Sequence, residues 1–373
     1  MKRFHNLDFL RALAMIMGLV IHAPLIFWSP DFAKVYGIDN VAPAQEWINI
    51  MGRFISNWRM PLFFLLSGFF AILVIERKGI SQFLRDRIIR VGLTCLIFSS
   101  LYDISDGSFD FTTLHLWFLF ELMIIVLVFS LLYRLKMIKK LLSMKLTPKI
   151  FFFLTLWLIS CVPLAFILNN WWHPLALKAS TSYFDLKIGN MLYYFSYFLV
   201  GVILYSNQKI FIKLKNIKTI FLLGNLSLFA FLLRIYSDHL TIGQADSLRN
   251  IAQIQFDPIL VFFNACMIGM NSILLCLLFI GLASKIIQSD SLIIRWFVEL
   301  SYPIYIIHII PVTMMSAVFH HAGFNQLSIL PLAVITGFII CVILYYVFIK
   351  FTPLNWFING YSKSPLKLKF LSF

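Results

Sequence analysis

Hydrophobic residues in this chain form long runs that are separated by short polar loops. A helix needs roughly 20 apolar residues to cross the hydrocarbon core of a bilayer, and runs of that length are the unit to count. The pattern therefore predicts an all-α fold: a polytopic bundle of about ten transmembrane helices, forming one integral-membrane domain over residues 1–373. The expected spans are 8–28, 57–76, 88–104, 114–134, 150–169, 190–206, 219–236, 257–283, 293–318 and 327–350.

The composition supports a membrane protein. Hydrophobic residues make up 61% of the chain and charged residues only 13%, and the mean hydropathy is +0.88. A soluble domain cannot bury so large an apolar fraction. The five cysteines all lie in apolar runs without a metal-binding or disulfide spacing, so we expect no metal site.

The distribution of charge sets the expected orientation. A net charge of +15 would suit a nucleic-acid partner, but the basic residues gather in the loops 76–90, 134–149 and 209–218 and in the tail. The intervening loops are acidic or nearly neutral, and this alternation follows the positive-inside rule. We therefore expect no nucleic-acid binding, and we place both termini in the cytoplasm. The N-terminal run resembles a signal peptide, but Asp8 and Arg11 interrupt it, which favours an uncleaved first span.

The first span carries three ionisable residues: Asp8, Arg11 and His22. Arg11 and His22 are eleven residues apart, so at about 100° per residue they share one helix face, about 16 Å apart along the axis. Asp8 lies one turn before Arg11 and can pair with it. Charged groups in hydrocarbon are costly and mark functional sites, although Arg11 alone could snorkel and His22 alone could hydrogen-bond a neighbouring helix.

Two further arginine sites stand out. Arg87 and Arg90 share a face at the start of the third expected span, where paired guanidinium groups suit a phosphate-rich ligand or contribute ordinary positive-inside charge. Arg59 begins the second span at the outer rim, a position where arginines also snorkel. Ser67 and Gly68 in that span are small enough for another helix backbone to approach closely.

Polar residues also enter the fourth span. Trp117 and Glu121 are four residues apart on one face, and His115 lies at the outer interface. A tryptophan there is typical of an interfacial belt, whereas a glutamate one or two turns inside indicates a polar cavity.

The ninth span carries a polar stripe. Ser301, Tyr305 and His308 follow helical spacing on one face, which indicates a wet pocket. Pro303 and Pro311 are expected to kink this helix.

These segments together resemble a known family. Arg11 and His22 match the Arg-x10-His signature in the first span of the acyltransferase-3 family of bacterial inner-membrane proteins, and Arg87 and Arg90 match its Arg-x-x-Arg pair. Within that family, the segments RMPLFFLLSGFF, RIIRVG, HLWFL and SYPIYIIH resemble, in the same order, the branch that contains the periplasmic-glucan succinyltransferase. The resemblance runs from residue 7 to about residue 312.

The resemblance implies an O-acyltransferase of the bacterial inner membrane. It would move an acetyl or succinyl group from cytoplasmic acyl-coenzyme A, a co-substrate and not a tightly bound cofactor, to a hydroxyl of an extracytoplasmic glycan or glycolipid. His22 would act as general base or form an acyl-histidine, with Glu121, His115 or His308 orienting it or donating to the oxyanion. Arg11, Arg87 and Arg90 would bind the coenzyme A, and Arg59, His115 and Trp117 would contact the acceptor.

Two other classes of function fit a polar stripe in a membrane bundle. A transporter of an envelope precursor or small anionic solute also buries charges along its route, although the two-fold repeat common in carriers is not evident in the sequence. A non-catalytic scaffold or flippase partner in envelope assembly is the other alternative. The sequence specifies neither the acceptor nor an oligomeric state.

Overall fold

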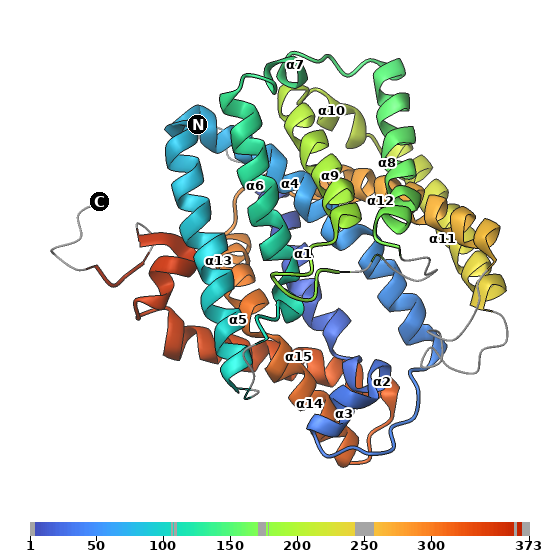
Figure 1. Ribbon diagram of the computed structural model, residues 1–373, viewed down its shortest axis with the longest axis vertical. Coiled ribbons are helices and arrows are strands. Elements are labelled where there is room, and N and C mark those ends of the chain that lie inside the picture. Colours follow the sequence, from blue (N-terminus) through green and yellow to red (C-terminus); the bar gives the residue numbers. More distant parts are fainter. Residues whose placement is uncertain are drawn as a thin grey trace. The chain divides into compact units, whose positions relative to one another are not determined.

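A computed structural model describes residues 4–105, 107, 110–170, 177, 179–242, 257–361 and 364–367. Within these residues the secondary structure is helical, apart from one isolated antiparallel bridge between Thr112 and Ser182 (Figure 1). The prediction of an all-α fold is confirmed. The principal helices are α1 (His5–His22), α4 (Glu46–Arg87), α5 (Thr94–Ser105), α6 (Trp117–Arg134), α8 (Pro148–Leu168), α9 (Ile188–Ser206), α11 (Ile217–Ile242), α12 (Pro258–Ile286), α13 (Leu292–Ile307), α14 (Ile309–His321) and α15 (Gln326–Leu344).

Short helices connect these long ones. They are α2 (Leu25–Trp28), α3 (Pro30–Val35), the π-helical turn η1 (Ile88–Leu93), the 3-10 turn η2 (Leu114–Leu116), α7 (Lys139–Leu142), α10 (Ile210–Leu214), and the π-helical turns η4 (Tyr345–Ile349) and η5 (Trp356–Gly360). The loop expected between the first two spans, residues 29–56, is thus partly helical, because α3 and the first turns of α4 occupy it. Most of the acidic loop expected over 237–256 lies outside the described residues.

Seven helical stretches in the described chain are long and apolar enough to cross a membrane, and α13 with α14, bent by 73°, would make an eighth. The ten expected spans differ from this count at two places. Helix α1 is not among the seven, since Asp8, Arg11 and His22 lower its hydropathy. Residues 46–104 count as one stretch, which the sequence divides into two spans. The number ten and the cytoplasmic termini stay predictions.

The division of that long stretch has a local cause. Gly79 adopts φ +80° and ψ 163° inside α4, a backbone conformation that favours glycine and interrupts the helix. The chain continues through the last turns of α4 into η1 and α5. The kink therefore lies within the basic segment 76–90 that separates the second and third expected spans.

Helix starts follow capping signals in the sequence. The side chains of Thr147 and Asp257 accept hydrogen bonds from backbone N–H groups of the next helix, at 3.3 and 2.8 Å, and each is followed by proline. Ser291 and Asn325 cap α13 and α15 in the same way. These caps satisfy N–H groups that would otherwise have no partner in the first turn.

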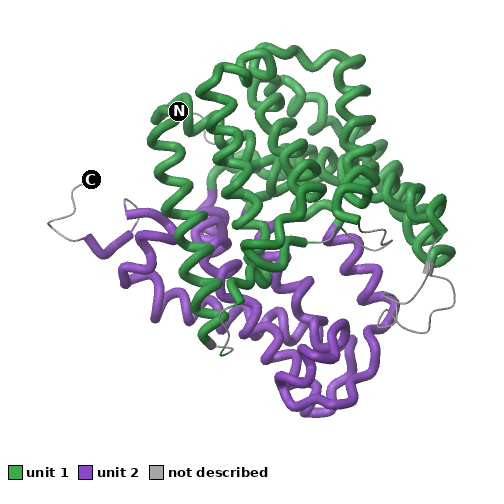
Figure 2. The backbone as a smooth tube through the Cα atoms, viewed as in Figure 1, with its two compact units in different colours: residues 1–11, 57–243, 255–290 green, residues 12–56, 244–254, 291–373 purple. Residues whose placement is uncertain are grey.

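The chain divides into two compact units (Figure 2). Unit 1 comprises residues 1–11, 57–243 and 255–290, and unit 2 comprises residues 12–56, 244–254 and 291–373. In unit 1, a Cβ atom built on Gly68 of α4 would lie 1.9 Å from the backbone oxygen of Phe198, and one built on Gly201 of α9 would lie 1.8 Å from that of Leu65. The expected close approach of a second backbone at Gly68 is confirmed, and its partner is α9.

Unit 2 contains the larger part of α1, helices α2 and α3, the first turns of α4, and α13 to α15. Helix α14 packs against α15 and α2. A Cβ atom on Gly337 of α15 would lie 3.0 Å from the Cα atom of Val312, so α14 and α15 also approach closely. This packing positions the start of α14, which carries the first candidate site.

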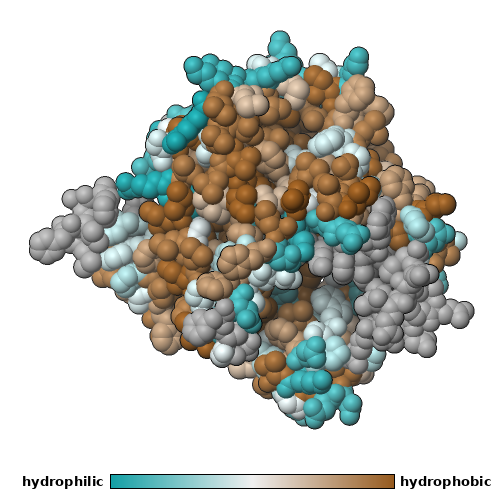
Figure 3. All heavy atoms as spheres, viewed as in Figure 1, coloured by the Kyte–Doolittle hydropathy of each residue, from teal (hydrophilic) through white to brown (hydrophobic). Residues whose placement is uncertain are grey.

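Large apolar side chains lie on the outside of several long helices. Among them are Phe152 and Phe153 on α8, and Phe221 and Phe229 on α11, each more than half exposed. Figure 3 shows apolar side chains spread over the helices, with hydrophilic ones gathered near α7 at one edge. A surface of this kind suits lipid, and with the seven apolar helices it identifies a multi-span membrane protein.

Candidate active site

A pair of histidines forms the first candidate site, within unit 2. His22 is the last residue of α1, and His308 lies between α13 and α14. His22 Nδ1 and His308 Nε2 are 2.7 Å apart, a hydrogen-bond distance across 286 positions of sequence. His308 is fully buried, whereas His22 is half-buried. The structure thus brings together two of the three residues that the sequence proposed for catalysis.

The hydrogen bonds of this pair define which ring nitrogens carry protons. His308 Nδ1 lies 2.6 Å from the backbone oxygen of Tyr305, and a carbonyl oxygen can only accept. In the neutral pair, His308 therefore carries its proton on Nδ1, and its Nε2 accepts a hydrogen bond from His22 Nδ1. It follows that the lone pair of neutral His22 resides on Nε2.

The residues next to His22 hold it against α14. Ser316 Oγ donates to the backbone oxygen of Ala23 at 2.8 Å. One turn earlier on α14, Thr313 Oγ1 and the hydroxyl of Tyr36 form a hydrogen bond of 2.7 Å. The contacts of Ala23 and Tyr36 therefore attach the segment after α1 to α14 and position His22 relative to this helix.

The break at His308 has a cause in the sequence. Pro311 has no N–H, and its ring collides with the carbonyl four residues earlier, that of Ile307, where α13 ends. The two helices meet at 73°. The expected kink at Pro311 is confirmed, whereas Pro303 remains inside α13 without breaking it. Ser301 donates its hydroxyl to the backbone oxygen of Val298 at 3.0 Å, so it serves its own helix.

The three arginines that the sequence proposed for binding coenzyme A lie in unit 1. The guanidinium of Arg11 is 3.3 Å from the Asp8 carboxylate, which confirms the expected pair, and it stacks 4.8 Å from the ring centre of Phe70. Arg87 ends α4 and lies 5.4 Å from the ring centre of Phe83, while Arg90 is in the π-helical turn η1. All three arginines are partly exposed, and π-helical turns recur at functional sites.

Three further candidate residues, Arg59, Trp117 and Glu121, lie near Tyr194 of α9 in unit 1. The rings of Trp117 and Tyr194 are 5.8 Å apart. Tyr194 also lies close enough to Arg59 and Glu121 to interact electrostatically with both. Arg59 is only 6% exposed and lies inside α4, which begins eleven residues before the predicted span. Its expected position at the outer rim of the membrane stays a prediction. His115 is buried in η2, its ring 5.3 Å from that of Tyr102.

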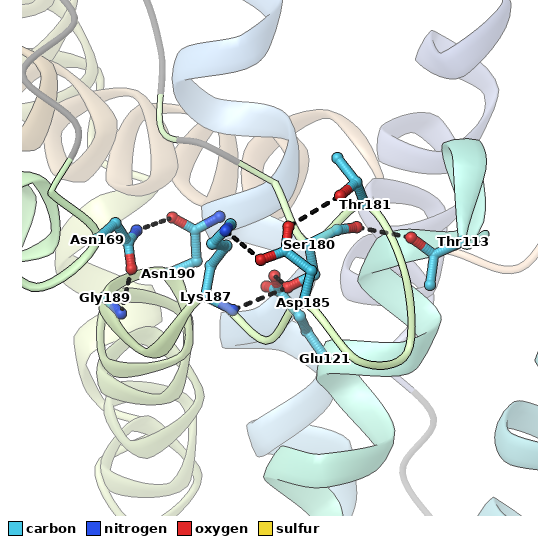
Figure 4. A network of polar contacts seen from close by, with 9 residues as sticks. All are labelled: Thr113, Glu121, Asn169, Ser180, Thr181, Asp185, Lys187, Gly189 and Asn190. Carbon is cyan, nitrogen blue, oxygen red and sulfur yellow. Dashed lines mark hydrogen bonds and ion pairs between the residues drawn. The ribbon is translucent and has the colours of Figure 1, made fainter. Parts of the chain in front are cut away.

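Glu121 belongs to a polar network shown in Figure 4. It is fully buried, and its Oε1 accepts a hydrogen bond of 2.7 Å from Ser180 Oγ. The backbone oxygen of Ser180 accepts from Thr113 Oγ1 at 2.6 Å, and its hydroxyl accepts from the backbone N–H of Lys187 at 3.2 Å. Glu121 therefore anchors the loop that leads into α9.

The same loop carries an ion pair outside the helices. Lys187 Nζ contacts the carboxylate of Asp185, and Thr181 Oγ1 donates to it at 2.8 Å. The hydrogen bond from Lys187 and then that from Thr181 hold the pKa of Asp185 below its usual value. Neither the loop nor Tyr194 was predicted from the sequence, because the loop has no periodicity that would place it beside α6.

A second buried network in unit 1 was also missed. Arg234 and Asp238 of α11 are almost fully buried, with Arg234 Nε 3.8 Å from Asp238 Oδ2. Arg234 also donates to Asn57 of α4, and Asn264 of α12 donates to Asp238. Asp238 was expected in a loop, because the predicted span ends at 236, but α11 continues to Ile242. The signal was present as opposite charges at i and i+4 beside an apolar run.

Comparison with known proteins now adds to this geometry. A family profile described as an acyltransferase domain matches residues 4–346. A curated relative, "Glucans biosynthesis protein C" of Escherichia coli K12, is 30% identical over 95 residues, or 26% of this chain and 23% of the relative. The protein of the same name from Escherichia coli O1:K1 / APEC matches to the same extent. No solved structure matches the chain.

The fold and the family define the class: a multi-span, all-helical membrane protein related to acyltransferases. Because the profile covers most of its length, the chain belongs to the acyltransferase-3 family. The aligned segment covers about a quarter of the length of the curated relatives.

Proposed function

We propose that this protein is an O-acyltransferase of the bacterial inner membrane. It moves an acyl group, acetyl or succinyl, from cytoplasmic acyl-coenzyme A to a hydroxyl of an extracytoplasmic glycan or glycolipid. Membership of the acyltransferase-3 family supports the reaction class, and the curated relatives named for glucan biosynthesis support a carbohydrate acceptor.

The observation that carries the proposal is the ordered histidine pair. Its hydrogen-bond chain, from His22 Nδ1 to His308 Nε2 and from His308 Nδ1 to the Tyr305 carbonyl, leaves Nε2 of His22 as the basic nitrogen. An imidazole is suited to accept a proton near neutral pH. His22 is the catalytic residue of the proposal, and His308 is a positioning residue that acts through it.

The proposed step balances without a metal or redox partner. His22 Nε2 takes the proton from an acceptor hydroxyl as its oxygen attacks the thioester carbonyl. The C–S bond of the tetrahedral intermediate then breaks, and the coenzyme A sulfur leaves with the proton held by His22. The products are the O-acyl sugar and free coenzyme A.

An acyl-histidine route uses the same nitrogen. Nε2 would attack the thioester directly and then pass the acyl group to the acceptor. Rapid quenching in the absence of acceptor tests this version, since only this route accumulates acyl groups on His22. In both routes the Nδ1–H of neutral His308 already donates a hydrogen bond to the Tyr305 carbonyl, so we propose His115 or Glu121 as the oxyanion donor.

The remaining site residues divide between the two substrates. Arg87 and Arg90 are proposed to hold the phosphates of coenzyme A, and Arg11 to hold phosphate or to line the route of the pantetheine arm. Arg11 and His22 lie on one continuous helix, about 16 Å apart along its axis, so α1 would carry both ends of that route.

The acceptor is proposed to contact Arg59, Trp117 and His115, with Trp117 stacking on a sugar ring. The support is the clustering of Arg59 and Trp117 around Tyr194, and the anchoring of a neighbouring loop by Glu121.

The test uses purified protein in nanodiscs with radiolabelled acetyl- or succinyl-coenzyme A and periplasmic glucan as acceptor. An enzyme releases free coenzyme A and labels the glucan, and His22→Ala lowers both rates by about 10²- to 10⁴-fold while inserting normally. A transporter would do neither chemical step in the wild-type protein. A scaffold would leave glycan modification in cells unaffected by His22→Ala, and either result would overturn the proposal.

A further inference from the structure

An apolar groove lies in unit 1. Helices α8, α9 and α12 form its walls, with Leu65 of α4 and Leu146 of the segment before α8. Its lining includes Leu146, Phe151, Leu158, Val200, Ile273 and Cys276.

The wall of the groove suits hydrocarbon. Of the lining side chains, Thr155 and Tyr197 carry hydroxyls. Thr155 Oγ1 donates to the backbone oxygen of Phe151 at 2.9 Å, so this group is already satisfied within α8. A sugar or a nucleotide would lose hydrogen bonds to water in such a wall, whereas an acyl chain loses none.

Two basic loops meet at one end of the groove. The side chain of Asn207, just after α9, accepts a hydrogen bond from the backbone N–H of Leu146 and donates to the oxygen of Met144, both at 2.9 Å. This double contact ties the segment before α8 to the end of α9. Lys145 lies between the two residues that Asn207 contacts, and Lys209 follows Asn207 by two positions, so both lysines flank this double contact.

A third lysine, Lys149, lies in the first turn of α8, two residues before Phe151 of the groove lining. Lys145, Lys149 and Lys209 are all exposed, and within the described part of the chain none of them makes an ion pair. Figure 3 shows hydrophilic side chains gathered near α7 at the edge of the molecule where α8 begins. Positive charge at the rim of an apolar groove complements an anionic amphiphile.

We propose that this groove binds an anionic phospholipid. One acyl chain lies between α8, α9 and α12, and the headgroup phosphate contacts Lys145, Lys149 and Lys209. The lipid would bridge α8 and α12 to α9, whose other face packs on α4 at Gly68 and Gly201. This site is independent of the proposed acyl transfer, because it shares no residue with either substrate site.

The test is native mass spectrometry of the full chain, delipidated in detergent and titrated with phosphatidylglycerol or with phosphatidylcholine of the same chains. We expect phosphatidylglycerol to bind at least about tenfold more tightly, since each basic residue near the rim favours an anionic headgroup. Changing Lys145, Lys149 and Lys209 together to glutamine should remove that preference. The matched control changes Lys213, Lys215 and Lys218, which carry the same total charge in the rest of the basic loop 209–218, and should retain the preference.

Two further measurements test the contributions of the acyl chain and of the headgroup phosphate separately. Thr155→Phe fills the groove with the lysines intact and should weaken the binding of both lipids about tenfold. Inorganic phosphate alone should not compete at millimolar concentration, because the acyl chain supplies the apolar contact. Equal binding of the two lipids, an equal loss in the control triple variant, displacement by phosphate, or unchanged binding in Thr155→Phe would each overturn the site.

Discussion

Replacing His308 tests the proposed catalytic geometry most directly. In the proposal, His22 becomes positively charged when it takes the proton of the acceptor, and its Nδ1–H then donates a charge-assisted hydrogen bond to His308 Nε2, 2.7 Å away. A hydrogen bond to a charged group contributes about 1.5–3 kcal/mol. If that bond strengthens only in the transition state, its loss in His308→Ala lowers kcat by about 10- to 150-fold.

The two substitutions at this position should differ. His308→Gln can offer a side-chain oxygen to His22 Nδ1–H, so we expect it to lose less than tenfold in kcat. His308→Ala offers no acceptor and also leaves a cavity at a fully buried position. His22→Ala should lose about 10²- to 10⁴-fold, the usual contribution of a general base. The KM for acyl-coenzyme A should change little in all three variants, because His308 is not assigned to the donor.

The assay is initial-rate release of coenzyme A thiol with saturating acceptor, in protein whose melting temperature has been checked. The comparison of the glutamine and alanine variants is decisive, since a purely structural role would make their losses follow stability and not hydrogen-bonding capacity. The reasoning is refuted if folded His308→Ala retains wild-type kcat, or if His308→Gln is as impaired as His308→Ala.

Three other predictions concern unit 1. Gly68→Ala places a methyl group into a backbone contact and should destabilise the protein by about 2 kcal/mol or more, measured as a lower melting temperature. Gly224→Ala on α11, a position with open space around it, should leave the melting temperature unchanged. Arg90→Ala should raise the KM for acyl-coenzyme A about tenfold, the effect of losing one charged phosphate contact, with kcat nearly unchanged; unaltered KM would contradict the assignment. Arg234→Met leaves Asp238 buried without its cation and should lower the free energy of unfolding by about 3–5 kcal/mol. The double variant with Asp238→Leu should recover part of this loss. If the losses of the two single variants simply add up in the double variant, the pair is not coupled.

Much of the fold can be predicted from the hydrophobic pattern alone, because a chain that crosses a bilayer needs long apolar helices. Helix ends were harder to predict than helices. The sequence ended the seventh span at 236 because Ser237 and Asp238 are polar, yet α11 continues to Ile242, since Asp238 finds Arg234 and Asn264 as partners. A hydropathy window cannot predict hydrogen-bond partners that lie on other helices, such as Asn264 on α12.

The site shows the same limit. The stripe of Arg11 and His22 could be predicted, because one helix places both residues. The pairing of His22 with His308 could not, since it depends on the 73° break between α13 and α14 and on the anchoring of Ala23 by Ser316. Proline at 311 indicated that a kink would occur, but not which residue it would bring to His22.

The polar residues of α1 differ in what their contacts leave available. The guanidinium of Arg11 is 3.3 Å from a carboxylate and stacked on Phe70, so much of its charge and one of its faces are already engaged. A phosphate of coenzyme A would have to compete with Asp8 for it. Of the two roles proposed for Arg11, these contacts favour lining the route of the pantetheine arm, an uncharged chain that needs no counter-ion. Arg87 and Arg90 would then bind the phosphates. The ion pair of Asp8 with Arg11 explains how α1 tolerates both charges in a membrane bundle.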